Sequence, residues 1–293
     1  MRPYVSVIIP AYNSAAFLPA AIASVRAQGW EELEIIVVDD GSTDHTRSVL
    51  DTLTGSDLRV FRQANSGPSA ARNRGIKESQ GEWVAFLDAD CYWLPGKLDA
   101  QFSALGSNPE PVGFSYTGSL LVDEEGQTLA TRRAVPRGCL VEDLVWGNLI
   151  STSSAIARRE ALLAVGMFDE TLRIGEDWDL WLRLAANFKG SCVSEPLMAE
   201  RTSCWDGKYQ MQIYEAATLK IVPRFFDSLQ GNQRLTLLAR KKQCALSWHL
   251  SVLAKSYLRR RQVANFVRLA AKSVAAHPQG VGFLLSGRRP THA

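Results

Sequence analysis

Between residues 5 and 87, short apolar segments alternate with helical ones, and this alternation constrains the fold more than any other feature of the sequence. The apolar segments are four to five residues long and rich in Val, Ile, Phe and Trp, which is typical of buried strands. Strands that are joined by helices form a parallel, doubly wound sheet. The predicted strands are residues 5–9, 35–38, 58–61 and 83–87, and the predicted helices between them are residues 15–28, 43–53 and 69–79.

Polar residues follow three of these strands, at the point where each strand ends. They form the segments 10–13, 39–44 and 88–90. Ligands of doubly wound sheets bind beyond the carboxyl ends of the strands. We therefore expect these three segments to converge on one site.

The rest of the chain has a different pattern. Residues 112–150 read as short strands and turns, residues 160–165 and 176–187 as helices, and the chain after about residue 209 as helical and basic. With 293 residues, one large domain plus an extension is the natural prediction. We expect an α/β domain over residues 1–209 and a basic helical region over residues 210–293.

Several features favour a cytoplasmic protein. No apolar run approaches the roughly 18 residues that a membrane-spanning helix needs, and Pro10 interrupts the N-terminal apolar segment too early for a signal peptide. The cysteines are odd in number and lack CxxC spacing, which argues against a disulfide framework and a structural zinc site. They are Cys91, Cys139, Cys192, Cys204 and Cys244.

The net charge of +3 conceals an asymmetry. Residues 1–219 contain 19 Lys and Arg against 29 Asp and Glu, whereas residues 220–293 contain 14 against the single acid Asp227. Residues 257–274 also place apolar side chains at helical spacing, with arginines mostly off that stripe. The basic region is either a solvated helical face or a surface attracted to anionic lipid or to a phosphate-bearing acceptor. The apolar stripe comprises Leu258, Val263, Phe266, Val267, Ala270 and Val274.

Each polar motif is ambiguous when taken singly. Asp88-Ala89-Asp90 offers oxygen ligands for Mg²⁺ or Mn²⁺, but acidic turns after strands are common. The segment 39–44 can accept hydrogen bonds from a base or ribose, or cap a helix. Tyr12 can lie against a flat base or fill the core. The acids of 176–179 fit a helix N-terminus, or supply a general base beside an aromatic wall.

The motifs are specific when they are taken together and in this order. From Val5 to about Glu200 the sequence resembles the family-two inverting glycosyltransferases. That resemblance implies a GT-A fold: a Rossmann-like, mostly parallel central sheet with flanking helices, here followed by a C-terminal helical extension. It rests on the blocks Val7-Ile8-Ile9-Pro10-Ala11-Tyr12-Asn13, Val37-Val38-Asp39-Asp40-Gly41-Ser42-Thr43-Asp44, Gly67-Pro68-Ser69-Ala70-Ala71-Arg72-Asn73-Arg74-Gly75, Phe86-Leu87-Asp88-Ala89-Asp90 and Gly175-Glu176-Asp177-Trp178-Asp179-Leu180-Trp181.

The resemblance also implies roles for individual residues. Asp40 would contact the base edge of the nucleotide and Tyr12 its face, while Asp88 would contact the ribose or the metal shell. Asp90 would ligate the Mn²⁺ or Mg²⁺ that bridges the two phosphates, and Asp177 would be the catalytic base. The nucleotide-sugar side as a whole comprises Pro10, Ala11, Tyr12, Asn13, Asp40, Arg72, Asn73, Asp88 and Ala89.

On the acceptor side the resemblance points to Glu176 and Trp178, and to the segment Asn148 to Ser154. Two departures from the family pattern stand out. Many relatives add a histidine to the metal shell, whereas this chain has no histidine between residues 46 and 248. The QxxRW motif of processive synthases is also absent, which favours transfer of a single sugar.

The resemblance implies transfer of a sugar from UDP or dTDP to a hydroxyl of a glycan or lipid-linked acceptor, in surface polysaccharide synthesis. The basic helices are also compatible with a peripheral contact at the inner face of the cell membrane. A sugar-nucleotide nucleotidyltransferase is one alternative, although the segment 10–15 is unlike a glycine-rich phosphate loop. A non-catalytic nucleotide-sugar-binding module is another, and a nucleic-acid partner is not expected.

Overall fold

A computed structural model describes residues 4–53, 55–106, 112–135, 139–202, 211–230, 232 and 235–286. The chain divides into two compact units. Unit 1 comprises residues 1–138 and 149–206, and unit 2 comprises residues 139–148 and 207–293. The boundary expected at residues 209 and 210 lies outside the described residues, so it stays a prediction.

Unit 1 contains a nine-stranded mixed sheet with the order β3-β2-β1-β4-β8-β6-β9-β5, and β7 pairs with β6. β1 pairs in parallel with both β2 and β4, and β2 pairs in parallel with β3, as the alternation predicted. Beyond β4 the pairing is antiparallel except between β6 and β9. The strands are β1 (Val5–Ala11), β2 (Leu33–Asp39), β3 (Leu58–Arg62), β4 (Trp83–Phe86), β5 (Tyr92–Trp93), β6 (Val112–Val122), β7 (Thr128–Arg132), β8 (Ile156–Arg158) and β9 (Lys189–Arg201).

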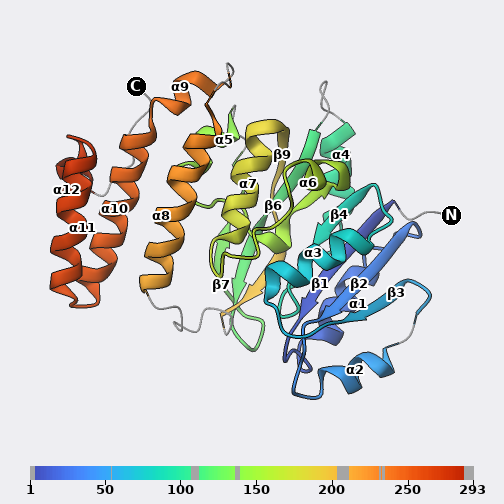
Figure 1. Cartoon of the computed structure of the whole chain (residues 1–293). Coiled ribbons are helices and arrows are strands. Elements are labelled where there is room, and N and C mark those ends of the chain that lie inside the picture. The colour runs from blue at the N-terminus through green and yellow to red at the C-terminus, as the bar shows by residue number, and fades with distance from the viewer. Residues whose placement is uncertain are drawn as a thin grey trace. The chain divides into compact units, whose positions relative to one another are not determined.

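Helices flank this sheet, so the α/β class with a helical extension is confirmed (Figure 1). The helices of unit 1 are α1 (Leu18–Arg26), α2 (Thr46–Thr52), α3 (Pro68–Glu78), α4 (Lys97–Gly106), α6 (Arg159–Ala164) and α7 (Glu176–Asn187), with the 3₁₀ turn η1 (Thr152–Ser154).

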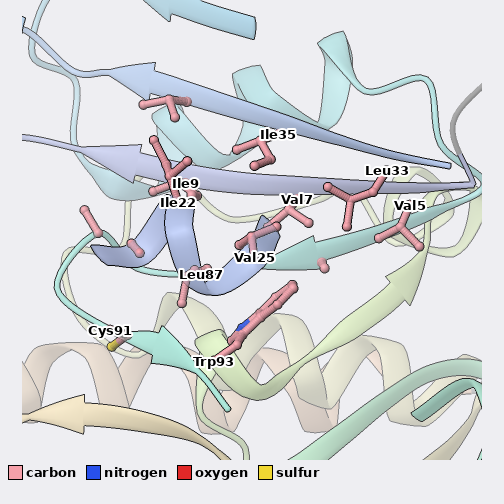
Figure 2. Close-up of a cluster of buried hydrophobic side chains, with 14 of the residues drawn as sticks. Val5, Val7, Ile9, Ile22, Val25, Leu33, Ile35, Leu87, Cys91 and Trp93 are labelled. Carbon is pink, nitrogen blue, oxygen red and sulfur yellow. The ribbon is translucent and has the colours of Figure 1, made fainter. Parts of the chain in front are cut away.

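Both faces of β1 are buried, which explains its nearly continuous apolar sequence. Alternate side chains of a strand point to opposite faces. Val5, Val7 and Ile9 therefore lie together in the core that α1 covers, where Ile22 of α1 meets them (Figure 2). The intervening residue Ile8 points to the other face, toward α3.

Helix α3 lies unusually close to β1, and a glycine makes this approach feasible. A Cβ atom on Gly75 would lie 2.5 Å from Cγ2 of Ile8. Any larger residue at position 75 would displace either Ile8 or the helix. The sequence therefore fixes the height of α3 above the sheet at this point.

The regular elements among the described residues of unit 2 are all helices. Helix α10 packs against both α8 and α11 (Figure 1). The segment 139–148, which contains α5, belongs to this unit: Trp248 Nε1 donates to the carbonyl of Trp146 at 3.1 Å, and Nε2 of His249 lies 2.8 Å from that of Val145. The helices are α5 (Leu140–Leu144), α8 (Met211–Ser228), α9 (Thr236–Ala239), α10 (Lys242–Arg259), α11 (Val263–Ala276) and α12 (Gly280–Ser286).

Residues 257–274 were predicted to form one amphipathic helix, and this prediction was wrong because the segment contains parts of two helices. α10 ends at Arg259, Arg261 adopts a left-handed φ of 59°, and α11 begins at Val263. The reversal lets α11 fold back on α10, where Ser273 Oγ donates to the carbonyl of Ser247 at 2.8 Å. In the part of the chain described here, no helix has the length and hydropathy needed to cross a bilayer.

A carboxylate on α8 joins three helices of unit 2. Both oxygens of Glu215 accept hydrogen bonds from Arg268 of α11 at 2.7 Å, and Tyr257 of α10 donates to the same carboxylate at 3.0 Å. Chiefly because of the hydrogen bonds from Arg268, the pKa of Glu215 is lowered from its usual value. A lowered carboxyl pKa in the folded state means that ionised Glu215 stabilises the fold.

Replacing Glu215 is expected to remove a pH-dependent part of the stability. The contribution is fully present above the unfolded-state pKa of about 4.3 and is lost as pH falls through the lower folded pKa. Glu215→Gln should therefore lower the free energy of unfolding at pH 7 by roughly 1–2 kcal/mol, given that Arg268 is partly exposed. The difference from wild type should shrink as the solution is acidified below the unfolded-state pKa.

Urea unfolding followed by circular dichroism at neutral and acidic pH measures this difference. Asp227→Asn is the matched control, because Asp227 pairs with Lys242 in the same unit with its side chain 54% exposed. We expect the control to change stability by at most about 0.5 kcal/mol. An equal loss from Glu215→Gln at both pH values would contradict the assignment.

Candidate active site

The three polar segments expected to converge do lie at one edge of the sheet. β1, β2 and β4 are parallel neighbours, so their carboxyl ends face the same way. The main chain joins these ends directly: Asp40 N donates to the carbonyl of Ala11 at 2.8 Å, and Leu87 N to that of Ile8 at 3.0 Å. The sheet therefore assembles one site from segments that are up to 80 residues apart in the sequence.

Asp40 is buried and holds the loop before α3. Its Oδ1 accepts hydrogen bonds from Gln63 Nε2 at 2.8 Å and from the amide of Ser66 at 2.9 Å, and its Oδ2 accepts one from the amide of Gly67 at 2.8 Å. Gly67 directly precedes Pro68, at which α3 starts. The carboxylate thus links the end of β2 to the start of the helix that carries Arg72.

Asn13 and Tyr12 form the rim of this edge. Asn13 adopts a left-handed φ of 51°, and its Oδ1 accepts from the amide of Thr43 at 2.8 Å, which connects the loops after β1 and β2. The Tyr12 side chain is 49% exposed, unlike that of a core residue. An exposed ring at a strand end is available to stack on a planar ligand.

Arg72 occupies the centre of the site. It is buried on α3, and its two terminal nitrogens donate to Asp88 Oδ1 at 2.6 Å and to Glu176 Oε1 at 2.9 Å. Burial opposes its charge, but the two carboxylates outweigh this effect, and the pKa of Arg72 is raised. One guanidinium therefore connects the turn after β4 to the first residue of α7.

Asp177 lies in the first turn of α7, next to the residue that Arg72 holds. The hydroxyl of Thr152 in η1 points to its Oδ2 at 3.4 Å. The neighbouring residue of η1, Ser153, accepts a hydrogen bond at its Oγ from the amide of Asp88 at 2.9 Å. The segment 152–154 thus contacts both acidic motifs, whereas contact of Asn148 to Ser154 with an acceptor stays a prediction.

The start of α7 is held in place from both sides. Arg183 pairs with Asp179 one turn earlier on α7, and its Nη2 also donates to the carbonyl of Met167 at 2.7 Å. Asn73 donates to the carbonyl of Phe168 and accepts from its amide, both at 2.9 Å. The Asn73 amide is thus engaged with the loop before α7, and its nearness to a nucleotide stays a prediction.

A buried support lies beneath η1. Trp93 Nε1 donates to the carbonyl of Ser153 at 2.9 Å, and Gln101 Nε2 to that of Ser154 at 3.2 Å. The Lys97 ammonium donates to Gln101 at 2.7 Å and lies 4.2 Å from the centre of the Trp93 ring. Burial lowers the pKa of Lys97 well below its usual value. These contacts hold the main chain of η1 in place.

Asp90 differs from Asp88 in its surroundings. Among the described residues, the only hydrogen bond to its carboxylate is from the Cys91 thiol at 3.5 Å. Its carbonyl accepts from Nη1 of Arg201 at 2.7 Å, and the Arg201 guanidinium lies over the ring of Tyr92. A carboxylate of this kind suits Mg²⁺ or Mn²⁺, which complete their shell with substrate phosphates and water.

The protein side chains alone do not form a complete metal shell. Within the described ranges, no group of three or more His, Cys, Asp and Glu residues is placed to hold an ion. Asp88 pairs with Arg72, whereas the carboxylate of Asp90 has oxygen lone pairs left to bind an ion. The residues thus fit an ion held mainly by Asp90 and a bound diphosphate.

Not every predicted site residue offers its side chain to a ligand. Ala11, Ala89 and Trp178 are buried, and Pro10 is half-buried. Glu176, predicted on the acceptor side, is paired with Arg72. Contacts of these residues with a substrate stay predictions.

Two residues that contact the acidic motifs were not predicted: Gln63 donates to Asp40, and Arg201 donates to the carbonyl of Asp90. Ser153, which accepts from the amide of Asp88, lies within the predicted segment Asn148 to Ser154. Gln63 directly follows β3, so the strand-end argument applies to it as well. No predicted motif contains Arg201.

Comparisons with known proteins find similar sequences among glycosyltransferases. The profile described as Glycosyl transferase family 2 matches residues 6–159. An uncharacterized glycosyltransferase of Rickettsia felis is 34% identical over 188 residues, which are 62% of this chain and 31% of that protein. The putative teichuronic acid biosynthesis glycosyltransferase TuaG of Bacillus subtilis is 33% identical over 186 residues, or 62% of this chain and 72% of TuaG. The chain thus spans about a third of the length of the Rickettsia protein.

Solved structures show the same fold. Residues 1–349 of TarS from S. aureus match 94% of this chain and 91% of that one, with a TM-score of 0.56 and 20% sequence identity. The complex of the same TarS fragment with UDP-GlcNAc matches with a TM-score of 0.57 and 19% identity. At this identity the likeness concerns the fold. Because the family profile matches more than half of the residues of this chain, the chain belongs to glycosyl transferase family 2.

Proposed function

We propose that this chain transfers a single sugar from a UDP- or dTDP-sugar to a hydroxyl of a glycan or lipid-linked acceptor, with inversion and with help from Mn²⁺ or Mg²⁺. The observation that carries the proposal is the bridge through Arg72, which joins the Asp88 turn to the first turn of α7. It brings a motif suited to a diphosphate next to a carboxylate suited to proton removal. A role in surface polysaccharide synthesis is supported by the similarity to TuaG.

On the donor side, Tyr12 and Asp40 would bind the nucleoside. The exposed Tyr12 ring can lie on the base, and Asp40 has one lone pair of Oδ2 beyond its three protein donors for a base N–H. A pyrimidine with such an N–H fits this arrangement. TarS has been solved with UDP, a donor nucleotide of this kind.

The diphosphate would lie beside Asp90, which would hold the metal ion together with phosphate oxygens. When bound, the ion supplies charge stabilisation to the leaving nucleoside diphosphate. Arg201 adds a fixed positive charge from the protein, because its guanidinium reaches the main chain of Asp90. Positive charge placed where negative charge develops lowers the barrier.

On the acceptor side, Asp177 would take the proton of the attacking hydroxyl. Thr152 contacts one of its oxygens and so orients the carboxylate. The acceptor oxygen forms a bond to the anomeric carbon as the bond to the diphosphate breaks on the opposite face. A single displacement of this kind inverts the anomeric configuration.

The first experiment is calorimetric titration with UDP, dTDP and GDP, each with Mn²⁺ and with chelator. We expect UDP or dTDP to bind in a metal-dependent manner, because Asp90 alone offers too few ligands to hold an ion without phosphate. Asp90→Ala should lose the metal-dependent part of the affinity. Asp51→Ala, which removes an exposed carboxylate of the same unit, should bind like wild type. Equal donor affinity in wild type and Asp90→Ala would refute the metal role of Asp90.

Asp177→Asn separates binding from chemistry. The substitution keeps the shape of the side chain and removes its basicity, so donor binding should be unchanged while transfer falls by roughly 10²- to 10⁴-fold. Nucleoside diphosphate release in the presence of acceptor measures transfer. Full transfer by Asp177→Asn would exclude it as the base. Donor binding without turnover by the wild-type chain with a range of acceptors would instead favour a non-catalytic binding module.

Arg72→Lys tests the bridge. An ammonium group cannot reproduce the planar fork that reaches both carboxylates, so we expect kcat/KM to fall roughly a hundredfold. The same change should cost about 1–3 kcal/mol in unfolding free energy. Arg74→Lys is the matched control on the same helix, because Arg74 is 46% exposed, pairs with Glu78 and lies over the ring of Phe61 without contacting Asp88 or Glu176. Wild-type kcat/KM in Arg72→Lys would show that the bridge does not position the reacting groups.

A further inference from the structure

Helix α11 has an apolar face that no described residue covers. The side chains of Val263, Val267 and Val274 are 58%, 56% and 40% exposed. At 100° per residue these three valines point in nearly the same direction. Exposed alanines extend this side of the helix, and we call the whole set the α11 apolar face. Its members are Val263, Ala264, Val267, Ala271, Val274 and Ala275.

The adjoining side of α11 forms the packing contact within unit 2. Leu269 and Ser273 are fully buried, and Phe266 and Ala270 pack against the same core. The apolar stripe seen in the sequence therefore splits. Its Phe266 and Ala270 are used inside unit 2, whereas its valines face solvent. Internal packing therefore accounts for only two of the six residues of the stripe.

The charged side chains of α11 and of the turn before it are all basic. Arg268 and Lys272 are exposed along one border, and Arg259, Arg260 and Arg261 are exposed where the chain enters the helix. No Asp or Glu follows Asp227 in the sequence. Arg268 pairs with Glu215, but the arginines of 259–261 form no ion pair with a described residue.

These charges favour one partner over another. An anionic bilayer surface attracts the basic border and accepts the small apolar side chains into its interfacial region. A second copy of this chain would bring the same arginines close to one another across a twofold axis, which is repulsive. The chemistry therefore matches lipid and disfavours self-association.

We infer that the α11 apolar face, with its arginine and lysine border, docks on the surface of an anionic lipid bilayer. The face is shallow, since it consists of valines and alanines, so apolar contact and charge must act together. Binding should therefore be reversible and should weaken as salt screens the charges. The inference does not depend on the reaction proposed above, because binding to vesicles requires neither donor nor acceptor.

Flotation of the full chain with vesicles tests the inference. We expect binding to vesicles of phosphatidylglycerol and phosphatidylcholine, and much weaker binding to phosphatidylcholine alone. Val267→Asp should weaken binding to the anionic vesicles by about tenfold, because it removes one valine that the bilayer would bury and adds a negative charge that the anionic lipid repels. Leu237→Asp adds the same charge at a 73% exposed position of α9 in the same unit, and should bind like wild type.

Circular dichroism establishes that the variants fold. The double variant Val263→Ser, Val267→Ser tests the contribution of apolar contact to vesicle binding without adding charge. It should also bind more weakly than wild type. Failure of the wild-type chain to float with anionic vesicles would overturn the inference, as would wild-type binding by both α11 variants. Equal losses in Val267→Asp and Leu237→Asp would show that charge alone acts. A dimer in light scattering that Val267→Asp abolishes would assign the face to a second copy instead.

Discussion

The buried guanidinium of Arg72 is the interaction on which the site depends. A buried cation is strongly unfavourable unless carboxylates compensate it, and here one comes from the turn after β4 and the other from the start of α7. Removing either carboxylate would leave one terminal nitrogen of the guanidinium without its acceptor. The bridge therefore makes the positions of α3, the Asp88 turn and α7 interdependent, although Arg72 and Glu176 are 104 residues apart.

Much of this arrangement could be predicted from local sequence. The strands β1 to β4 are short apolar runs with breaks at both ends, so their type and parallel order follow from pattern, and the convergence of Asp40, Asp88 and Tyr12 follows from parallel order. The partners of Arg72 and Asn73 could not be predicted. Neither the pairing of Arg72 with Glu176 nor that of Asn73 with Phe168 leaves a periodic signal, because each joins segments that only the folded sheet brings together.

The second half of the sheet and unit 2 show the same limit. β6 and β9 pair in parallel although they are far apart in the sequence, and β8 lies between β4 and β6 in reversed direction. The segment 139–148 groups with the C-terminal helices through contacts to Trp248 and His249. An amphipathic pattern identified α11 but not its break from α10, since no glycine or proline marks the turn at Arg261.

The contact between Gly75 and Ile8 has a consequence for how this sequence tolerates change. Gly75 lies three residues, about one helical turn, after Arg72 on α3. A side chain at position 75 would raise the helix from β1, and the guanidinium would move with it away from its two carboxylates. Substitution at position 75 is thus limited by the geometry of the Arg72 bridge as well as by packing against Ile8. A shorter side chain at position 8 is the natural second-site suppressor, because it restores the space that a Cβ atom would occupy.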